Sequence, residues 1–451
     1  MKITVIGTGY VGLVSGVCFA EMGMEVTCVD NQPEKIASLR RGEVPIYEPG
    51  LEEMVARNVA AGRLSFTANL KEAISESEVV SIAVGTPTRA RDGFADLSYV
   101  YGVAEEIAAT LDHYAVIVTK STVPAGTGYE IARIIRSANP ALDFDVASNP
   151  EFLREGCAVE DFMQPDRVVV GVESERAREV MNRLYAPLSQ RGVPVFFTRI
   201  ISSELIKYAA NTFLATKVSF INEVADLCES LGADVEDVAK GIGLDSRIGP
   251  KFLKAGPGYG GSCFPKDTLA MVGIGERALS PITIVEAVIA VNRQRQHRMT
   301  AKVIEACGGV VEGKKIAYLG VAFKAETDDV RDSVALTVAE ALAHKGAQVA
   351  AYDPKAMANA EKITGSVIEY VASKEDAIKG AEVLVLATEW EEFCTMDMAA
   401  VKTQLAAPVV VDMRNVFSPE EMEKLGFTYI SIGRPPVLAP TSAQARKQQA
   451  N

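Results

Sequence analysis

Histidine and cysteine are scarce in this chain of 451 residues, and their placement excludes several kinds of site. The three histidines, His113, His297 and His344, lie far apart in the sequence, so we expect neither a histidine-based triad nor a metal centre. The seven cysteines include no CxxC pair and their number is odd, which argues against a zinc site and against a disulfide framework. A reducing cytoplasm agrees with this use of cysteine.

Long apolar runs and an excess of basic residues are also missing. No run reaches the roughly 18 apolar residues of a membrane-spanning helix, and the start, MKITVIG, is too short an apolar stretch for a secretory signal. Asp and Glu number 59 against 46 Lys and Arg, a formal net charge of −13. Nucleic acid and anionic membranes are therefore not expected partners, because both attract a basic surface.

The first part of the chain alternates short apolar runs with helical patterns. Its runs are KITVIG, MEVTCVD, EVVSIAVGT, YAVIVTKST and FDVASNPEF. Continuous runs of Val, Ile and Ala are typical of buried parallel strands, and strands alternating with helices predict a doubly wound α/β sheet. A second set follows near residue 314, in KKIAYLGVAF, GAQVAAYDP, AEVLVLAT and APVVVDMRN.

Between these two regions, residues 202–305 carry apolar side chains at helical spacing over many turns, which predicts helices, one of them a long connecting helix. We therefore expect an α/β protein with two Rossmann-like doubly wound domains joined by a helical middle domain. The expected boundaries are 1–200, 201–305 and 306–435, with a poorly ordered tail over 436–451. Ligands of such a two-lobed protein usually bind between the lobes. Homodimerisation through the long helix is a hypothesis.

A glycine-rich turn, GTGYVG, follows the first expected strand and opens a helix. Gly7, Gly9 and Gly12 permit a tight turn and the close approach of a pyrophosphate to the helix N-terminus. Asp30 ends the second strand, where a carboxylate accepts hydrogen bonds from ribose hydroxyls and repels a 2′-phosphate, which favours NAD over NADP. Lys35 could support the same ribose or be a solvated helix lysine.

Small hydroxyl side chains follow two further strands, in GTPT (85–88) and KSTVP (120–124). Ligands of open α/β sheets bind at the carboxyl ends of strands, although either segment could equally be a plain turn. In NPEFLREG (149–156), Glu151 and Glu155 are four residues apart, and on a helix both would face one side. In a cleft they could position or deprotonate water; outside one they form a solvated acidic turn.

Lys207 and Asn211 share one face of an otherwise apolar helix pattern. A buried cation there needs a partner or a task such as stabilising an oxyanion, unless the lysine extends to the surface.

The stretch GPGYGGSCFPKDT (256–268) surrounds Cys263 with flexible and polar residues. A helix is expected to start near Pro265, because proline suits the first turn. A helix N-terminus and nearby Lys266 both favour the thiolate, which can attack an aldehyde. The alternative, a small buried hydrophobe, suits Cys18, Cys28, Cys228 and Cys307 better than Cys263.

Together these segments resemble the UDP-glucose dehydrogenases of the UDP-glucose/GDP-mannose dehydrogenase family. The motifs that carry this resemblance occur in the same order as in the family, from residue 1 to about 333. The three-part layout extends the match to nearly the whole chain. The motifs are GTGYVGL, GTPT, KSTVPAGT, SNPEFLREG, ELIKYAANTFLATK, GLDSRIGPKFLKAGPGYGGSCFPKD and GVAFKAETDDVRDS. The resemblance implies that a primary alcohol becomes a carboxylate while two NAD⁺ are reduced.

The resemblance also implies roles for individual residues. Cys263 would trap the aldehyde as a thiohemiacetal, which a second oxidation turns into a thioester that water hydrolyses. Lys207 and Asn211 would steady the oxyanion, Asp267 with Thr122 would hold a water, and Glu151 would be the acid/base group. The implied NAD contacts are Gly7, Gly9, Val11, Gly12, Asp30, Lys35, Thr86, Thr122, Glu155, Lys266 and Arg331. The implied contacts to a UDP-sugar are Glu151, Phe152, Leu153, Lys207, Asn211, Phe252, Leu253, Lys254, Ala255, Gly256, Gly260 and Lys324, with Arg247 reaching the sugar nucleotide of a neighbouring subunit.

Three alternatives stay open at this point. The substrate could be GDP-mannose or a UDP-N-acetylhexosamine. The enzyme could stop at the aldehyde after one oxidation. From a different class, the chain could be a non-catalytic dinucleotide-binding redox sensor that uses Cys263 as its thiol, although no resolving cysteine is visible from the spacing.

Overall fold

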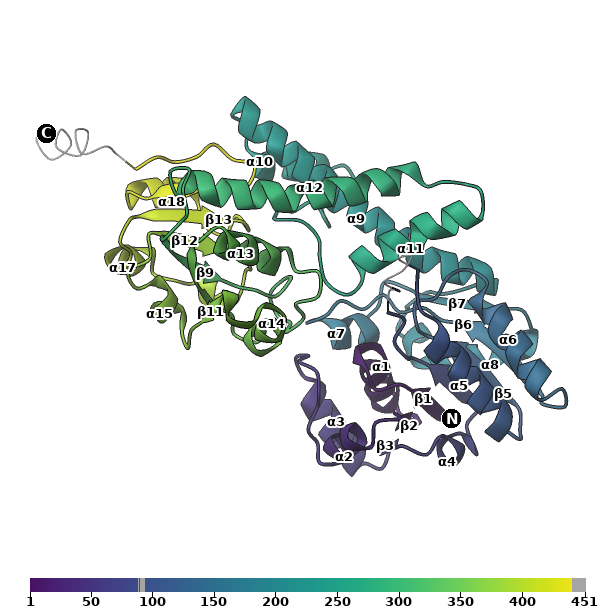
Figure 1. Ribbon diagram of the computed structural model, residues 1–451. Helices are drawn as coiled ribbons and strands as arrows, with labels where there is room; N and C mark the ends of the chain where they lie inside the picture. Colours follow the sequence, from purple (N-terminus) through teal and green to yellow (C-terminus); the bar gives the residue numbers. More distant parts are fainter. Residues whose placement is uncertain (88, 90–93, 440–451) are drawn as a thin grey trace, which may run out of the picture. The chain divides into compact units, whose positions relative to one another are not determined.

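Each of the two regions with repeated apolar runs builds one mainly parallel sheet, as predicted (Figure 1). A computed structural model describes residues 1–87, 89 and 94–439. Thr88 of the GTPT segment and residues 440–451 of the expected tail lie outside the described residues. The chain divides into two compact units, one of Met1–Ala210 with Leu269–Pro281, the other of Asn211–Thr268 with the chain from Ile282 onward.

The first unit holds an eight-stranded sheet in the order β3-β2-β1-β4-β5-β6-β7-β8. Its strands are β1 (Lys2–Ile6), β2 (Glu25–Val29), β3 (Leu64–Thr67), β4 (Val79–Ile82), β5 (Ala115–Thr119), β6 (Phe144–Ser148), β7 (Val168–Val172) and β8 (Val195–Thr198). Neighbouring strands pair in parallel except β6 and β7, which are antiparallel. The sequence analysis placed β1, β2, β4, β5 and β6 and missed β3, β7 and β8.

Helices cover both faces of this sheet, because alternate strand residues face opposite sides. Val5 and Val79 pack with α1 and α3, whereas Ile6 and Ile82 pack with α5 and α6. The helices are α1 (Tyr10–Glu21), α2 (Pro33–Arg40), α3 (Leu51–Ala60), α4 (Leu70–Ile74), α5 (Ser98–Thr110), α6 (Thr127–Ala138), α7 (Ala158–Met163) and α8 (Glu175–Ser189). The first sheet is therefore doubly wound.

The second unit holds a six-stranded parallel sheet in the order β11-β10-β9-β12-β13-β14. Its strands are β9 (Lys315–Leu319), β10 (Gln348–Tyr352), β11 (Glu369–Tyr370), β12 (Val383–Leu386), β13 (Val409–Asp412) and β14 (Thr428–Ile430). Its helices are α13 (Val334–His344), α14 (Met357–Thr364), α15 (Lys374–Ile378), α16 (Glu391–Cys394), α17 (Met398–Gln404) and α18 (Pro419–Lys424). The four predicted apolar runs of this region became β9, β10, β12 and β13.

The expected helical segment forms four helices, and the first is the long one. They are α9 (Ile200–Leu231), α10 (Val235–Gly243), α11 (Phe264–Arg277) and α12 (Thr283–Ala306). The compact units divide α9 between Ala210 and Asn211, and α11 between Thr268 and Leu269. A helical middle domain with boundaries at 201 and 305 stays a prediction.

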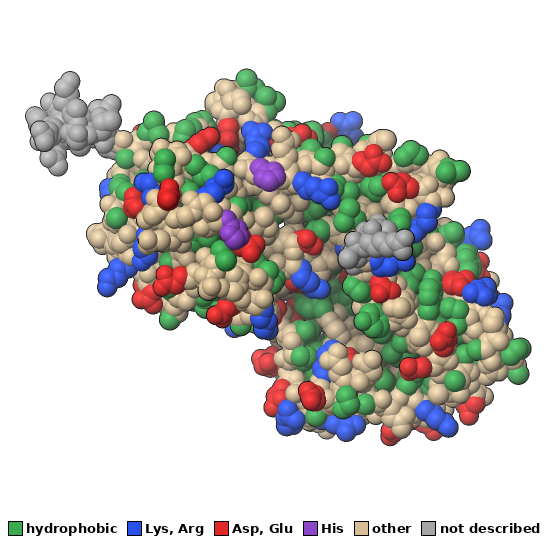
Figure 2. Space-filling model, viewed as in Figure 1, with side chains coloured by type: hydrophobic (Ala, Val, Ile, Leu, Met, Phe, Trp, Pro, Cys, Tyr) green, Lys and Arg blue, Asp and Glu red, His purple; other side chains and the backbone are tan. Residues whose placement is uncertain are grey.

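The surface shown in Figure 2 mixes acidic and basic side chains over both sheets' helices. Among the described residues no helix is long and apolar enough to cross a membrane.

Candidate active site

The glycine-rich turn after β1 leaves no room for side chains. A Cβ on Gly12 would lie 1.9 Å from the carbonyl oxygen of Gly7, and Gly7 itself has φ +99° with its Cβ position 2.6 Å from the oxygen of Ala83. α1 begins at Tyr10, directly after this turn, so its first backbone N–H groups point out at the carboxyl end of the sheet. Val11 is half-buried in that first turn. The turn can therefore admit a pyrophosphate.

Asp30 lies at the end of β2 beside this turn. Its Oδ2 accepts hydrogen bonds from the backbone N and from Oγ1 of Thr8, at 2.9 and 2.7 Å, and from Nζ of Lys35 at 3.0 Å. Burial alone would raise the pKa of Asp30, but these bonds outweigh it and hold the pKa below its usual value. An ionised carboxylate is thus fixed where a ribose hydroxyl could bind. Lys35 pairs with it, so it is not simply a solvated lysine.

The segments that follow β4 and β5 are connected by hydrogen bonds from the hydroxyl side chains singled out in the sequence. Oγ1 of Thr86 donates to the carbonyl oxygen of Thr122 at 3.0 Å, and Oγ of Ser121 donates to that of Val84 at 2.7 Å. Both threonines are half-buried. They lie together at the carboxyl edge of the sheet, where a ligand would bind.

The segment after β6 is not helical, so the condition under which Glu151 and Glu155 would share a helix face is not met. Pro150 cannot donate a backbone hydrogen bond and disfavours a helical conformation at Asn149, and α7 begins only at Ala158. Instead Glu151 is buried, and its Oε2 accepts a hydrogen bond from the backbone N of Leu153 at 2.5 Å. Glu155 is half-buried and contributes a negative charge felt by Tyr10.

Lys207 on α9 forms a buried ion pair with Glu151. Its Nζ donates to Oε1 of Glu151 at 3.1 Å and lies 5.2 Å from the ring centre of Phe152. Cζ of Arg167 lies 3.8 Å from the same ring centre, so Phe152 contacts two cations. The side chain of Lys207 is 3% exposed, which excludes a lysine that extends to the surface. A buried carboxylate and ammonium this close can hold or move a proton.

Asn211, one helical turn further along α9, belongs to the second unit. Its Nδ2 donates to Oδ2 of Asp267 at 2.6 Å, and Nζ of Lys266 donates to Oδ1 of the same carboxylate at 2.5 Å. Asp267 is buried. This carboxylate is therefore held from both sides at the start of α11.

Cys263 directly precedes α11, which begins at Phe264 close to the expected Pro265. The backbone N of Asp267 donates to the carbonyl oxygen of Cys263 at 2.8 Å, so Cys263 caps the helix N-terminus. Its Sγ lies 3.5 Å from Oγ of Ser262. Cys263 is half-buried, whereas Cys18, Cys28, Cys228 and Cys307 are buried, as predicted.

The glycine-rich loop before Cys263 is fastened to two helices. Gly256 is held by two hydrogen bonds of 2.9 Å: its backbone N donates to Oδ1 of Asn222, and its carbonyl oxygen accepts from Nε of Arg295. Asn292 holds Tyr259, accepting from its backbone N through Oδ1 and donating to its carbonyl oxygen through Nδ2, both at 2.9 Å. A Cβ on Gly260 would lie 2.3 Å from the carbonyl oxygen of Asp332. The glycines thus allow backbone segments to pass closely, and the loop is rigidly seated.

The remaining predicted substrate residues lie in the same unit as this loop. Phe252 adopts a positive φ of 65°, a strained conformation for a non-glycine residue. Leu253, Ala255 and Gly256 are buried, and Lys254 is exposed. Nζ of Lys324 lies 5.7 Å from the ring centre of Phe323.

A basic group surrounds Glu389 in this unit. Nε of Arg414 lies 3.1 Å from Oε2 of Glu389, and Nη2 of Arg414 donates to the carbonyl oxygen of Phe323 at 2.8 Å. Burial would raise the pKa of Glu389, but the charges of Arg414, Lys254 and Lys324 hold it below its usual value. The sequence analysis named both lysines and missed Arg414, because the strand end that carries Arg414 has no recognisable motif.

Two predicted arginines pair with neighbours in their own loops. Arg247 forms an ion pair with Asp245 at 2.6 Å and is 87% exposed, and Arg331 forms one with Asp329 at 2.7 Å. The carbonyl oxygen of Arg331 also accepts from the backbone N of Gly261 at 3.0 Å. Their ligand roles stay predictions.

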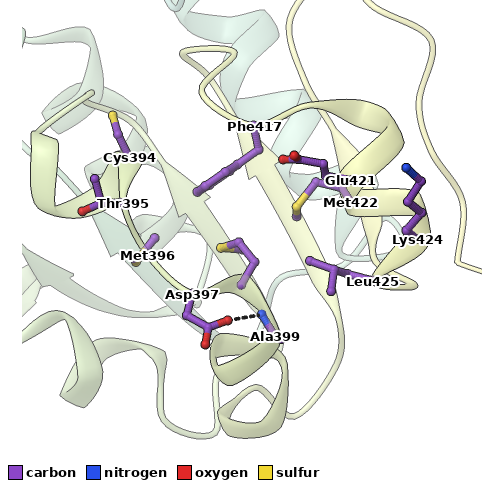
Figure 3. A pocket seen from close by; sticks show the side chains of 11 residues that line it. Cys394, Thr395, Met396, Asp397, Ala399, Phe417, Glu421, Met422, Lys424 and Leu425 are labelled. Atoms are coloured by element: carbon purple, nitrogen blue, oxygen red, sulfur yellow. Dashed lines mark hydrogen bonds between the residues drawn. The ribbon is translucent and has the colours of Figure 1, made fainter.

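A further pocket of about 570 Å³ lies in the second unit, and none of the predicted site residues lines it (Figure 3). Its wall carries the sulfur atoms of Cys394, Met396, Met398 and Met422, and Asp397 caps α17 beside it through a 2.9 Å bond from the backbone N of Ala399. Nothing in its lining indicates a reaction. Among the described residues no group of three or more His, Cys, Asp or Glu side chains is placed to hold a metal ion.

Comparison with known proteins gives matches along most of the chain. Residues 1–189 match the NAD binding domain, residues 201–294 the central domain and residues 317–419 the UDP binding domain of the UDP-glucose/GDP-mannose dehydrogenase family.

Individual relatives match over almost their full length. The UDP-glucose 6-dehydrogenase of Rhizobium meliloti (strain 1021) is 56% identical over 437 residues, which cover 96% of this chain and 100% of that protein. UDP-glucose 6-dehydrogenase TuaD of Bacillus subtilis (strain 168) is 49% identical over 437 residues, covering 97% of this chain and 94% of that protein. The structure of a UDP-glucose dehydrogenase from the archaeon Pyrobaculum islandicum superposes with a TM-score of 0.87 at 40% identity, covering 97% of this chain and 98% of that one.

Proposed function

This chain belongs to the UDP-glucose/GDP-mannose dehydrogenase family and is an NAD-dependent oxidoreductase, and we propose that it oxidises UDP-glucose to UDP-glucuronate with the reduction of two NAD⁺. Support for UDP-glucose comes from the two bacterial relatives at 56% and 49% identity, both of which carry the name UDP-glucose 6-dehydrogenase. Support for NAD comes from the ionised Asp30 beside the glycine turn, which would repel a 2′-phosphate.

The single observation that carries the covalent step is the half-buried Cys263 at the N-terminus of α11. The partial positive charge of a helix N-terminus stabilises a thiolate, and partial exposure lets a substrate reach it. An enzyme that takes an alcohol to an acid has to retain the aldehyde between two oxidations. A bond from Sγ of Cys263 to the aldehyde carbon retains it and prepares that carbon for the second oxidation.

The other proposed catalytic residues, Lys207, Asn211 and Glu151, act at the same sugar carbon. The glycine turn and Asp30 would hold NAD, which would supply the hydride acceptor for the two oxidations at C6 of the sugar. Lys207 and Asn211 donate hydrogen bonds to the sugar oxygen as it gains negative charge. In the last step Glu151 takes a proton from water while the water oxygen attacks the thioester carbon. The C–S bond breaks, the carboxylate leaves, and the thiolate of Cys263 is regenerated.

The basic residues around Glu389 suit the diphosphate of the substrate. Lys254, Lys324 and Arg414 bring three positive charges to one end of the second sheet in a chain whose net charge is −13. Arginine and lysine bind phosphate oxygens through charge-assisted hydrogen bonds. The other predicted contacts to UDP-glucose and NAD stay part of this proposal.

A homodimer or higher homo-oligomer is also proposed. α9 exposes Phe213, Phe220 and Leu227 at intervals of seven residues, with exposed Leu231 at its end. A stripe of this kind on one helix face forms a seam with a second copy. The predicted contact of Arg247 with a neighbouring subunit's sugar nucleotide agrees with its 87% exposure. A cytoplasmic location remains a prediction.

The test counts NADH formed per UDP-glucose consumed, in the wild type and in Cys263→Ala. We expect two NADH per sugar in the wild type, and no acid from Cys263→Ala although UDP-glucose still binds to it. One NADH per sugar would show an enzyme that stops at the aldehyde, and a strong preference for GDP-mannose would overturn the substrate. An absence of any NADH with all three nucleotide sugars would favour the redox sensor.

A further inference from the structure

Lys120 is a second buried lysine near Glu151, and none of the steps above uses it. It directly follows β5, and it is 3% exposed. Its Nζ donates a hydrogen bond to Oδ1 of Asn149 at 3.0 Å and lies 5.5 Å from the ring centre of Phe162. An ammonium group buried so deeply costs folding free energy, so it needs a reason to be there.

Asn149 links Lys120 to the segment that carries Glu151. Oδ1 of Asn149 also accepts a hydrogen bond from the hydroxyl of Tyr185, and its Nδ2 donates to the carbonyl oxygen of Val169 at 2.8 Å. Its backbone N donates to the carbonyl oxygen of Thr119 at 2.9 Å. Asn149 is therefore fixed from four sides, two residues before Glu151.

Several charged and titratable groups act on Lys120. Burial lowers the pKa of Lys120 to about 8; the carboxylate of Glu151 acts against this, the ammonium of Lys207 adds to it, and the thiol of Cys18 on α1 acts weakly against it. Tyr185 on α8 faces Lys120 through the shared oxygen of Asn149. Two buried ammonium groups thus act on one buried carboxylate.

We propose that Lys120 is a positioning residue for the hydrolytic step: its hydrogen bond to Asn149 fixes the segment that carries Glu151, and its ammonium group supplies a second positive charge that acts on Glu151 when Glu151 takes a proton from water. The inference rests on the proposed role of Glu151. Opposite charges favour each other's ionised forms over several ångströms in a buried site. Lys207 is then not the only cation that serves Glu151, and it can donate its hydrogen bond to the sugar oxygen without leaving the carboxylate unbalanced.

A purely structural role would not need the charge. A neutral side chain of similar length could fill the same space, and replacing a buried charge by an apolar group is often neutral or stabilising. A lysine that only fills space therefore predicts wild-type hydrolysis and unimpaired stability in its neutral variants, whereas the proposed role predicts slower hydrolysis with unimpaired stability.

The experiment compares Lys120→Met, Lys120→Gln and Glu151→Gln with the wild type. Lys120→Met removes the charge and the hydrogen bond to Asn149, whereas Lys120→Gln keeps a donor and removes the charge alone. Lys71→Met, at an exposed lysine of α4 in the same unit, is the matched control. Each variant is mixed with UDP-glucose and NAD⁺ between pH 6 and pH 9. NADH formation is followed, and the intact protein mass is measured after acid quenching to detect an acyl adduct on Cys263.

In both Lys120 variants we expect the acid limb of the pH–rate profile to move up by about one pH unit, a roughly tenfold slower hydrolysis on that limb. The acyl adduct should accumulate at pH 6.5 and diminish toward pH 9, with KM for UDP-glucose nearly unchanged and the melting temperature equal to or above that of the wild type. Lys71→Met should match the wild type throughout.

Three results would overturn the inference. One is that both Lys120 variants keep the acid limb of the wild-type pH–rate profile and accumulate no acyl adduct on Cys263. Another is an equal loss of the first hydride transfer, which indicates general damage to the site. The third is that both Lys120 variants fail to fold, since Lys120 would then be structural. If Glu151→Gln hydrolyses its thioester at the wild-type rate, the proposed function of Glu151 fails instead, whatever Lys120 does.

Discussion

The Nζ atom of Lys207 lies 3.1 Å from Oε1 of Glu151, although the two residues are 56 positions apart in the chain and their side chains are only 3% and 6% exposed. A buried ion pair contributes little net stability, because the desolvation of both groups offsets their attraction. The pair is therefore better explained by chemistry than by folding. It brings a proton acceptor from the segment after β6 and a hydrogen-bond donor from α9 to one place.

Glu151→Gln should damage both activity and stability. Loss of the base should slow hydrolysis of the thioester roughly 10²–10⁴-fold, so an acyl adduct accumulates on Cys263. The variant also leaves the ammonium groups of Lys207 and Lys120 without their buried counter-charge, which costs about 3–5 kcal/mol. Intact-mass measurement after quenching and urea unfolding check the two effects.

The double variant Glu151→Gln with Lys120→Met separates these effects. It should recover part of the lost stability, since one of the two uncompensated cations is gone, and recover no hydrolysis. Equal destabilisation of the single and double variants would contradict this account of the charges.

A charge swap tests the carboxylate at the start of α11. Asn211→Asp combined with Asp267→Asn keeps a hydrogen bond between the two positions, now with the amide at position 267, and moves the negative charge away from Lys266. We expect the swap to melt close to the wild type while its kcat falls at least roughly tenfold, because the role expected for Asp267, the holding of a water, needs a carboxylate at that position. Asn211→Asp alone would place two carboxylates in contact and should lose stability. A swap with wild-type kcat would show that only the hydrogen bond matters.

Asp30→Ala tests the cofactor preference. The change removes the acceptor for the ribose hydroxyl and frees Lys35, which now pairs with Asp30 at 3.0 Å, to meet a 2′-phosphate. The ratio of kcat/KM for NAD⁺ to that for NADP⁺ should fall roughly tenfold or more, since one hydrogen bond to a charged group is worth about 1.5–3 kcal/mol. Asp30→Ala with Lys35→Ala is the control, and it should lose NAD⁺ use without gaining NADP⁺ use. An unchanged ratio in Asp30→Ala would show that Asp30 does not select the cofactor.

Local sequence was enough to place five of the eight strands of the first sheet and the glycine-rich turn. GTGYVG needs its glycines for contacts within a few residues and with the adjacent strand, and Asp30 sits at the end of a run that can only be a buried strand. Five of the cysteines were sorted correctly: Cys263 has polar and flexible neighbours and is half-buried, whereas Cys18, Cys28, Cys228 and Cys307 are buried.

Long-range pairs were beyond local reasoning. Nothing near Lys207 indicates that Glu151 is its partner, and nothing near Asn211 indicates Asp267, because tertiary packing creates both contacts. Lys120 lies in the KSTVP segment, which was interpreted as a ligand-binding strand end or a plain turn, and its burial depends on tertiary packing. The condition that would place Glu151 and Glu155 on one helix face is not met, because Pro150 disfavours a helical conformation at Asn149 and α7 begins only at Ala158.

Glu204 near the start of α9 predicts a pH-dependent stability for the first unit. Its carboxyl oxygens accept hydrogen bonds from the backbone N of Gly126 and of Gly128, at 2.6 and 2.7 Å, at the N-terminus of α6. Burial raises the pKa of Glu204 to about 7, although the two N–H groups act in the opposite direction. In the unfolded chain a glutamate titrates near about 4.3. The folded state therefore binds more protons between these values.

The contribution of Glu204 to the free energy of unfolding is fully present below about pH 4.3 and is lost as the pH rises through about 7. The reason is that the unfolded state binds fewer protons than the folded state between these two pH values. The loss between pH 5 and pH 8 should be on the order of 3 kcal/mol. Glu204→Gln stays neutral, so its unfolding free energy should show a smaller decline over this range. Glu179→Gln, at an exposed position of α8, should follow the wild type. Urea unfolding at several pH values measures the slopes, and parallel slopes for the wild type and Glu204→Gln would mean that Glu204 stays ionised in the folded protein.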